Sequence, residues 1–182
     1  YRIGIASAAI EVRKLDPATN RFVDVAEFEP GVDPVPAAYS EVRTDGDTRY
    51  RISMAEGITS WQVMTALTAA DFLDGNLSAI PDEGSLAPDS YEVTAGDLRS
   101  EVVERMQAAQ SARLDEAWRN RADDLPVKTP QEALILASIV EKETGLPDER
   151  QDVASVFVNR LNRGMRLQTD PTVIYGITNG QG

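Results

Sequence analysis

Hydrophobic and polar residues alternate along the first part of the chain. Two alternating runs, at 10–15 and 21–28, flank the turn-forming segment 16–20, which predicts a β-hairpin with one buried face. Further strands are expected at 48–54 and 91–94, where apolar and polar residues again alternate. This part of the chain is therefore expected to be rich in β-structure.

Helical spacing of apolar residues dominates the rest of the chain. A Thr-x-x-Gln capping box at Thr59 predicts the start of a first helix. A long helix is expected over 98–120, with Asp97 as its N-cap and apolar residues at intervals of three and four. Residues 148–163 and 170–175 predict two further helices, the first with acidic residues at its start and basic residues at its end.

The most apolar helix is expected between a capping box and a helix stop. Thr129 is the predicted N-cap, Pro130 fits the first helical position, and Glu132 completes the box. Eight consecutive uncharged residues follow, and Gly145 with Pro147 predicts the end of the helix. Because this helix is apolar around most of its circumference, we expect it to be buried inside a domain.

Composition narrows the chemistry that the chain can perform. The 182 residues are 42% hydrophobic, enough for a real core, and include neither cysteine nor histidine. A Ser-His-Asp or Cys-His nucleophile, a thiol and a histidine-based zinc site are therefore excluded. Acid–base chemistry must come from Asp, Glu, Lys or Tyr, and we expect no metal.

The net charge and the hydropathy of the chain limit the kinds of partner that it can bind. A net charge of −12 argues against a nucleic-acid partner, because phosphate binding needs a basic surface. Residues 153–182 are the exception, with Arg160, Arg163 and Arg166 against Asp170. This basic cluster is compatible both with ligand contact and with simple solubility. No apolar run is long enough to cross a bilayer, and since the chain begins at a tyrosine we interpret it as an excised soluble portion of a longer protein.

Two carboxylates, Glu141 and Glu143, stand at the end of the most apolar helix. They lie about 200° apart around the helix, so they cannot share a face. A carboxyl group directed at the packed face would be partly desolvated and close to the negative helix end, and both effects favour the neutral acid that general acid catalysis needs. The alternative is that both side chains only solvate the helix end, and their spacing alone does not decide between the two.

The surrounding motifs resemble one enzyme family. They are the segments Leu136–Thr144, Glu149-Arg150, Val153–Leu161 and Gly164–Gly176. Together they are similar to the endolytic murein transglycosylases, the YceG-like or MltG family, and a looser similarity extends back to Arg51. The resemblance implies that Glu143, the second glutamate of the Glu-Lys-Glu-Thr string, is the catalytic acid.

The resemblance also implies a reaction. Glu143 would act as acid and then as base to cleave the β-1,4 bond between N-acetylmuramic acid and N-acetylglucosamine of peptidoglycan, with formation of a 1,6-anhydro ring and without a metal or cofactor. Candidate substrate-binding residues are Asn159, Arg160, Gln168, Thr169, Asp170 and Tyr175. Structural roles are the alternative for two of these residues and for Glu141. Asp170 can be an N-cap, Arg160 can offset a helix dipole, and Glu141 can pair with Lys142 or a nearby arginine.

The expected architecture is α+β, with a mainly helical catalytic part around a buried central helix. We expect an appended β-rich segment at 1–50, a LysM-like subdomain at 51–96 and a C-terminally truncated catalytic domain at 97–182. Within the second, the loop at 83–91 resembles one that the family carries, and it can face the substrate or be a simple turn anchored by Pro88 and Asp89.

The resemblance implies a place in the cell and a set of partners. It implies the periplasmic side of the bacterial inner membrane, with a single N-terminal anchor outside this chain. Peptidoglycan strands are the expected partner, and cell-wall synthesis enzymes are a further candidate. A non-catalytic peptidoglycan-binding or scaffold module is the alternative function.

Overall fold

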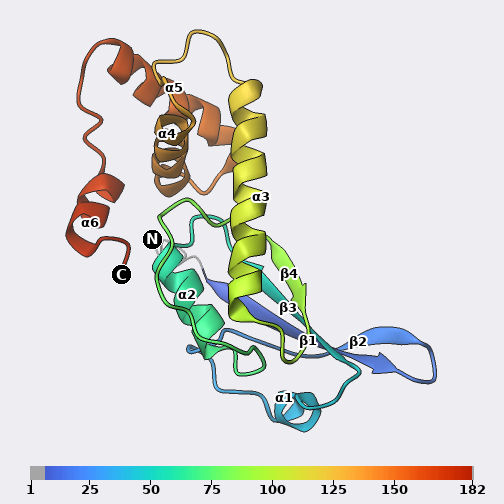
Figure 1. The fold of residues 1–182 in the computed structure, drawn as a ribbon. Coiled ribbons are helices and arrows are strands. Elements are labelled where there is room, and N and C mark those ends of the chain that lie inside the picture. The colour runs from blue at the N-terminus through green and yellow to red at the C-terminus, as the bar shows by residue number, and fades with distance from the viewer. Residues whose placement is uncertain (1–6, 182) are drawn as a thin grey trace.

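The computed structural model describes residues 7–181 as a mixed α/β fold (Figure 1). The strands are β1 (Ala8–Asp16), β2 (Arg21–Phe28), β3 (Thr48–Met54) and β4 (Ser90–Val93). The helices are α1 (Ala37–Val42), α2 (Ser60–Ala69), α3 (Arg99–Arg119), α4 (Pro130–Glu143), α5 (Arg150–Asn162) and α6 (Asp170–Thr178), with a short 3₁₀ helix η1 (Pro147–Glu149) before α5. The mixture of strands and helices predicted from the sequence is confirmed, and α1 is the helix that the sequence pattern missed.

The four strands form one antiparallel sheet in the order β2-β1-β3-β4. The predicted hairpin is present as β1 and β2, but β1 also pairs with β3, with Ile10 opposite Ile52. The hairpin therefore supplies a central strand of the sheet, and its status as an appended segment stays a prediction. Buried and partly exposed residues alternate along the first half of β1, so one side of this strand faces the core.

One face of the sheet packs against α2 and the first half of α3 (Figure 1). Tyr50 on β3 is almost fully buried and stacks on Phe72, with ring centroids 3.9 Å apart. The fully buried side chains of this larger core come from the sheet, α1, α2 and α3: Tyr39, Tyr50, Ile10, Ile52, Leu67, Met106, Val12, Val63 and Val102. Segments 1–50 and 51–96 thus share one core, while their status as separate domains, and the LysM-like character of the second, stay predictions.

Helix α3 connects this core to the remaining helices (Figure 1). Its 21 residues span about 31 Å, with the buried Val102 and Met106 in the half that lies on the sheet and α4 beside the other half. The helix begins one residue later than predicted. Asp97 is not the N-cap, because its carboxylate instead accepts hydrogen bonds from the N–H (2.8 Å) and hydroxyl (2.9 Å) of Thr94 and closes the preceding turn.

Helix α4 begins at the predicted residue, but Glu132 accepts the backbone N–H of Lys128 (2.6 Å) and does not complete the predicted capping box. The helix is also much more exposed than expected. Thr129 accepts the backbone N–H of Glu132 at 3.1 Å, and Pro130 is the first helical residue. Only Ile139 and Val140 of this helix are buried, and the side chain of Ile135 is 60% exposed. The expectation of a helix buried around most of its circumference is therefore wrong for the described residues, because its neighbours α3, α5 and α6 cover only part of it.

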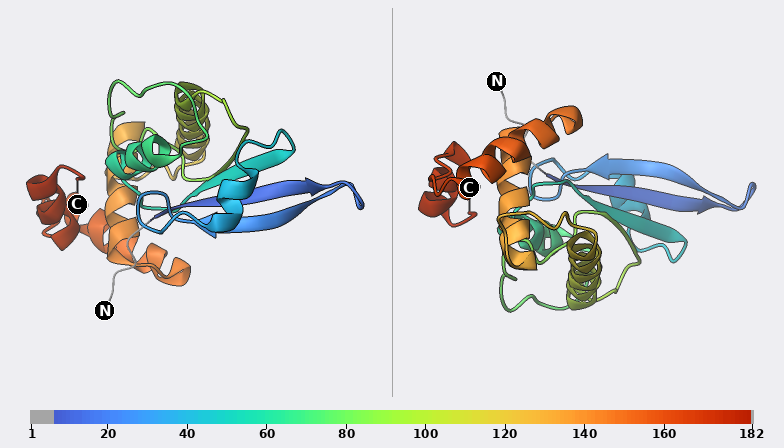
Figure 2. Two further views of the ribbon diagram at one scale, coloured as in Figure 1. Left: turned by 90° about the horizontal axis from the view of Figure 1, so that it is seen from below. Right: turned by 90° about the horizontal axis from the view of Figure 1, so that it is seen from above.

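The β1–β2 hairpin and α6 lie at opposite ends of the molecule (Figure 2). The hairpin extends well past the helices on one side, and α6 stands beyond α4 on the other. Between residues 7 and 181, none of the helices combines the length and the apolar character that crossing a membrane requires.

Candidate active site

The last turn of α4 and the residue after it contact three other segments of the chain, at Gly57, at 149–150 and at Thr169. Glu141, Lys142, Glu143 and Thr144 are consecutive, yet each side chain has its own partner residue. Successive residues of a helix point about 100° apart, so a four-residue string at a helix end can reach in four directions. The Glu-Lys-Glu-Thr string is therefore one of the points at which the sheet part and the helical part meet.

Glu143 is the last residue of α4, and its side chain is exposed. Its Oε1 accepts a hydrogen bond from the hydroxyl of Thr169, which is buried with 6% exposure and lies directly before α6. Glu143 is therefore not the partly desolvated carboxyl group that the sequence allowed on the packed face of this helix. The sequence did place Glu143 and Thr169 in one site, and the structure brings them together.

Thr144 ends the helix by its own backbone and side chain. It is buried and adopts an extended conformation at φ −143°, while its hydroxyl donates to Glu149 at 2.8 Å and accepts the N–H of Leu146 at 3.1 Å. Gly145 is not in the left-handed region, so the predicted glycine stop is wrong in its mechanism although the helix ends where expected. Glu143 is held in place because the residue after it is fixed on both sides.

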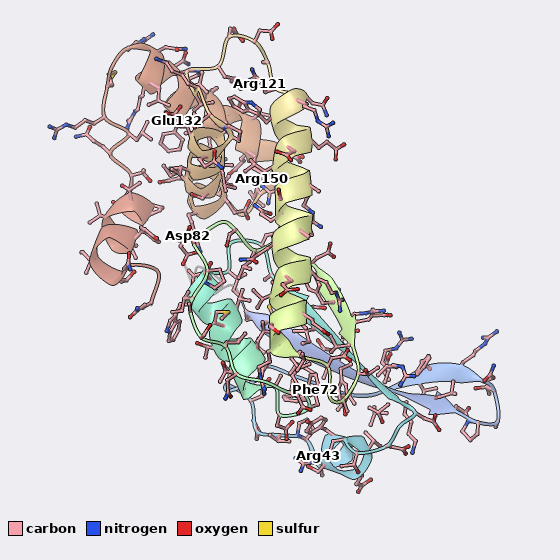
Figure 3. The ribbon with its side chains drawn as sticks, viewed as in Figure 1. Arg43, Phe72, Asp82, Arg121, Glu132 and Arg150 are labelled. Atoms are coloured by element: carbon pink, nitrogen blue, oxygen red, sulfur yellow. The ribbon has the colours of Figure 1, made fainter. Side chains whose placement is uncertain are left out.

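Glu141 and Lys142 join α4 to the turn between β3 and α2. Arg150, at the start of α5, lies 3.0 Å from Glu141 and 3.1 Å from Glu56, and bridges the two carboxylates. The Lys142 ammonium donates to the carbonyl of Gly57 at 2.7 Å. The predicted alternative for Glu141, pairing with a nearby arginine, is confirmed. Figure 3 places Arg150 between α4 and α3.

The segment between α5 and α6 carries the other candidate residues. Arg160 donates from its guanidinium to the carbonyl of Leu167 and so supports the backbone two residues before Thr169. Helix α5 ends with Gly164 at φ +66°, as the sequence predicts. The N-cap of α6 is Thr169, so Asp170 is the first helical residue and not the cap. Four candidates have exposed side chains that make no hydrogen bond to Glu143 in the described part of the chain: Asn159, Gln168, Asp170 and Tyr175.

The loop before β4 approaches both α4 and α6. Asp82 in this loop lies next to the end of α4 (Figure 3). Glu83 accepts the N–H of Ser60 at the start of α2 (3.0 Å), and its Oε1 would lie 2.6 Å from a Cβ built on Gly180, beyond α6. Glu83 is thus a second carboxylate near the C-terminal segment. The sequence singled out its loop but not this residue.

The far end of that loop is structural. Arg113 of α3 holds Pro88 and Asp89, so the interpretation of these residues as a turn anchor is confirmed. Tyr91 is a buried core aromatic whose hydroxyl donates to the carbonyl of Ala87 at 2.8 Å. Burial raises the pKa of Tyr91 and keeps it in the neutral, donating form.

Two hollows lie away from Glu143. One of about 120 Å³ is on the sheet and is lined by Arg13, Phe22 and Arg49 among others. The other, of about 490 Å³, runs along α2 and includes Trp61, Met64 and Ile80 in its lining. Neither of these two hollows is lined by Glu143, whose exposed side chain lies between the end of α4 and the start of α6.

The sequence of this chain is similar to those of known proteins. The sequence model of the YceG-like family matches residues 28–182, which include all of α4, α5 and α6. The chain belongs to the YceG-like family. This YceG-like chain is similar to the endolytic murein transglycosylase of Bacillus subtilis (strain 168), with 35% identity over 95 residues, 52% of this chain and 26% of that protein.

A second similar protein carries the same name, endolytic murein transglycosylase. The YceG-like chain is 34% identical over 94 residues to the endolytic murein transglycosylase of Streptococcus pneumoniae serotype 2 (strain D39), which is 51% of this chain and 16% of that protein. The alignments thus span only 26% and 16% of the length of these two curated relatives.

Proposed function

We propose that this YceG-like chain carries the catalytic glutamate of a peptidoglycan lytic transglycosylase of the bacterial cell envelope. Membership of the family and the names of both relatives support this function. The single observation that carries the assignment of the residue is the contact between Glu143, at the end of α4, and Thr169, at the start of α6. This contact brings together two distant parts of the sequence that resemble the family.

The proposed reaction uses Glu143 twice. As an acid, Glu143 gives its proton to the glycosidic oxygen, the bond from C1 of N-acetylmuramic acid to that oxygen breaks, and N-acetylglucosamine leaves with a new hydroxyl. As a carboxylate, Glu143 then takes the proton of the C6 hydroxyl, whose oxygen bonds to C1 and closes the 1,6-anhydro ring. The proton count of the enzyme is restored and no water is consumed.

This route explains how one carboxylate can suffice. Most glycosidases need a second carboxylate as base or nucleophile, whereas here the hydroxyl of the substrate takes the place of water. The absence of histidine and cysteine from the sequence leaves carboxylates, lysine and tyrosine as proton carriers. An exposed carboxyl on an open face is accessible to a long polymer such as a glycan strand. Asn159, Gln168, Asp170 and Tyr175 would line that face.

Glu143→Gln tests the proposal. In the intact protein, the variant should lose at least about 100-fold in the release of anhydro-ended fragments from glycan strands, measured by mass spectrometry, because amides do not donate a proton as acids do. Glu104→Gln is the matched control, since Glu104 is exposed on α3 and makes no hydrogen bond or ion pair among residues 7–181. The control should keep the wild-type rate.

The exposure of Glu143 favours one alternative, a peptidoglycan-binding scaffold without activity. The same experiment separates the two functions. A wild-type protein that binds glycan strands and releases no anhydro ends is a scaffold, and equal release by wild type and Glu143→Gln would remove Glu143 from the mechanism.

A further inference from the structure

Thr169 is buried although both of its neighbours are exposed. Its residue exposure is 6%, while Gln168 and Asp170 are open to solvent. A threonine directly before a helix normally uses its side-chain oxygen to accept a backbone N–H of the first turn. Thr169 makes no such capping bond, and its hydroxyl donates to Oε1 of Glu143 instead. The side chain of Thr169 thus forms its hydrogen bond with Glu143 and does not cap α6.

The backbone around Thr169 is fixed by several independent contacts. The carbonyl of Thr169 accepts both the N–H (3.2 Å) and the hydroxyl (2.7 Å) of Thr172. The guanidinium of Arg160 holds the carbonyl of Leu167 on the other side. Gln168 between them adopts a left-handed conformation at φ +51°, which a residue with a side chain rarely takes and which its surroundings must stabilise. The Thr169 hydroxyl is therefore presented in one position.

We propose that Thr169 is a positioning residue that gives the two oxygens of Glu143 different tasks. This inference rests on the proposed function. Oε1 accepts the Thr169 hydroxyl, and Oε2 carries the proton that goes to the glycosidic oxygen and later receives the proton of the substrate hydroxyl. A neutral carboxylic acid keeps acceptor capacity on its carbonyl oxygen, so the same hydrogen bond serves both protonation states.

The hydrogen bond from Thr169 orients the carboxyl group of Glu143. A glutamate side chain at a helix end has three rotatable bonds, and the exposed side chain of Glu143 would otherwise sample several rotamers. Anchoring one oxygen keeps the other at a constant place relative to α4 and α6. The sequence suggested Thr169 as a residue that binds sugar, but burial and commitment of its hydroxyl to Glu143 favour the indirect role.

Thr169→Val removes the hydroxyl and keeps the shape of the side chain. In the intact protein we expect kcat for anhydro-product release to fall about 10- to 100-fold, with KM changed by less than about threefold, because misplacing a reacting group affects the chemical step more than binding. Thr169→Ser, which retains the hydroxyl, should recover most of kcat. Thr44→Val, at an exposed site whose hydroxyl makes no hydrogen bond in the described part of the chain, is the control and should match the wild type.

The outcomes separate this inference from the proposed function. A rise in KM with kcat unchanged would overturn it in favour of sugar binding, and so would wild-type kinetics of Thr169→Val when Glu143→Gln is inactive. Activity of Glu143→Gln would instead overturn the proposed function itself. In a Glu143→Gln background, Thr169→Val should have no further effect on residual turnover. If Thr169→Val does not fold, Thr169→Cys replaces it, with a loss of kcat expected because a thiol is a weak donor.

Discussion

A single glycine controls how closely the loop before β4 approaches α4. Gly84 has φ +77°, a conformation that L-residues with a side chain rarely adopt. A Cβ built at Gly84 would lie 2.8 Å from Cδ2 of Leu134, whose side chain belongs to α4. The backbone angle therefore favours glycine at this position, and a larger residue would also have to displace the flexible end of Leu134.

Gly84→Ala should lower the free energy of unfolding by about 1–2 kcal/mol, mainly through the left-handed backbone, since the end of Leu134 can move aside. Gly46→Ala is the matched control, because its Cβ would meet no atom within 4 Å and its φ is not positive. Urea unfolding followed by circular dichroism measures both. Equal midpoints for Gly84→Ala and wild type would contradict the packing described for this loop.

The ends of the helices show what local sequence reveals and what it does not. The capping box of Thr59 and Gln62 is present with both of its hydrogen bonds, and Thr129 caps α4 as predicted. Asp97 was predicted as an N-cap and Asp170 had this role as an alternative, and neither residue is the N-cap of its helix. A short acidic side chain can bond its own turn or stand inside the first turn equally well, and the pattern of residue types does not distinguish these cases.

At the scale of elements, the structure fastens the end of α4 to the turn between β3 and α2. Arg150 bridges Glu56 and Glu141, which are far apart in sequence, and Lys142 reaches the carbonyl of Gly57. The side chains of Arg150 and Glu141 are 36% and 29% exposed, so water screens the attraction between them. The bridge therefore fixes orientation more than it adds stability.

Arg150→Met should cost no more than about 1 kcal/mol of unfolding free energy at low salt, and the loss should shrink in 0.5 M NaCl, because salt screens exposed ion pairs. Arg163→Met is the control, as Arg163 is exposed after α5 and has no ion-pair partner between residues 7 and 181. Urea unfolding at two salt concentrations measures the difference. A loss that is the same at both concentrations would show that Arg150 acts through packing.

The elements themselves could be predicted well, and their surroundings could not. The bounds of β3 and the positions of the hairpin and α4 follow from periodicity, turn residues and caps. The exposure of α4 did not follow, because an apolar helix surface does not say which elements will cover it. The contact between Thr169 and Glu143 joins residues 26 positions apart, and only the resemblance placed them in one site.

At the scale of the whole molecule, the described residues contain a large and a small hydrophobic core. The large core includes residues from Ala8 to Met106, and the small one consists of Ile139, Val140 and Phe157 with partly buried neighbours. Apolar burial is the main favourable contribution to folding. The helical part that carries Glu143 therefore has much less stabilisation of its own than the sheet part.

Hydrogen exchange should show this difference directly. Amides of β1 and β3 should exchange slowest, by global unfolding, and those of α4 and α5 earlier, by local opening. Phe157→Ala should speed exchange in α4 and α5 and leave β1 and β3 little changed, whereas Ile52→Ala should speed exchange throughout. Mass spectrometry of exchanged peptides resolves these segments. Identical acceleration of all segments by Phe157→Ala would mean that the two cores open as one.

The contacts of residues 141–144 with three other segments make the length of α4 a fixed quantity. One residue inserted or deleted within this helix would turn its last residues by about 100° and move them about 1.5 Å along the axis. Lys142 would then miss the carbonyl of Gly57 and Arg150 would be displaced from Glu56, whereas the contact of Thr144 with Glu149 lies wholly beyond the change. The length of α4 is therefore set by the contact of its last turn with the turn between β3 and α2.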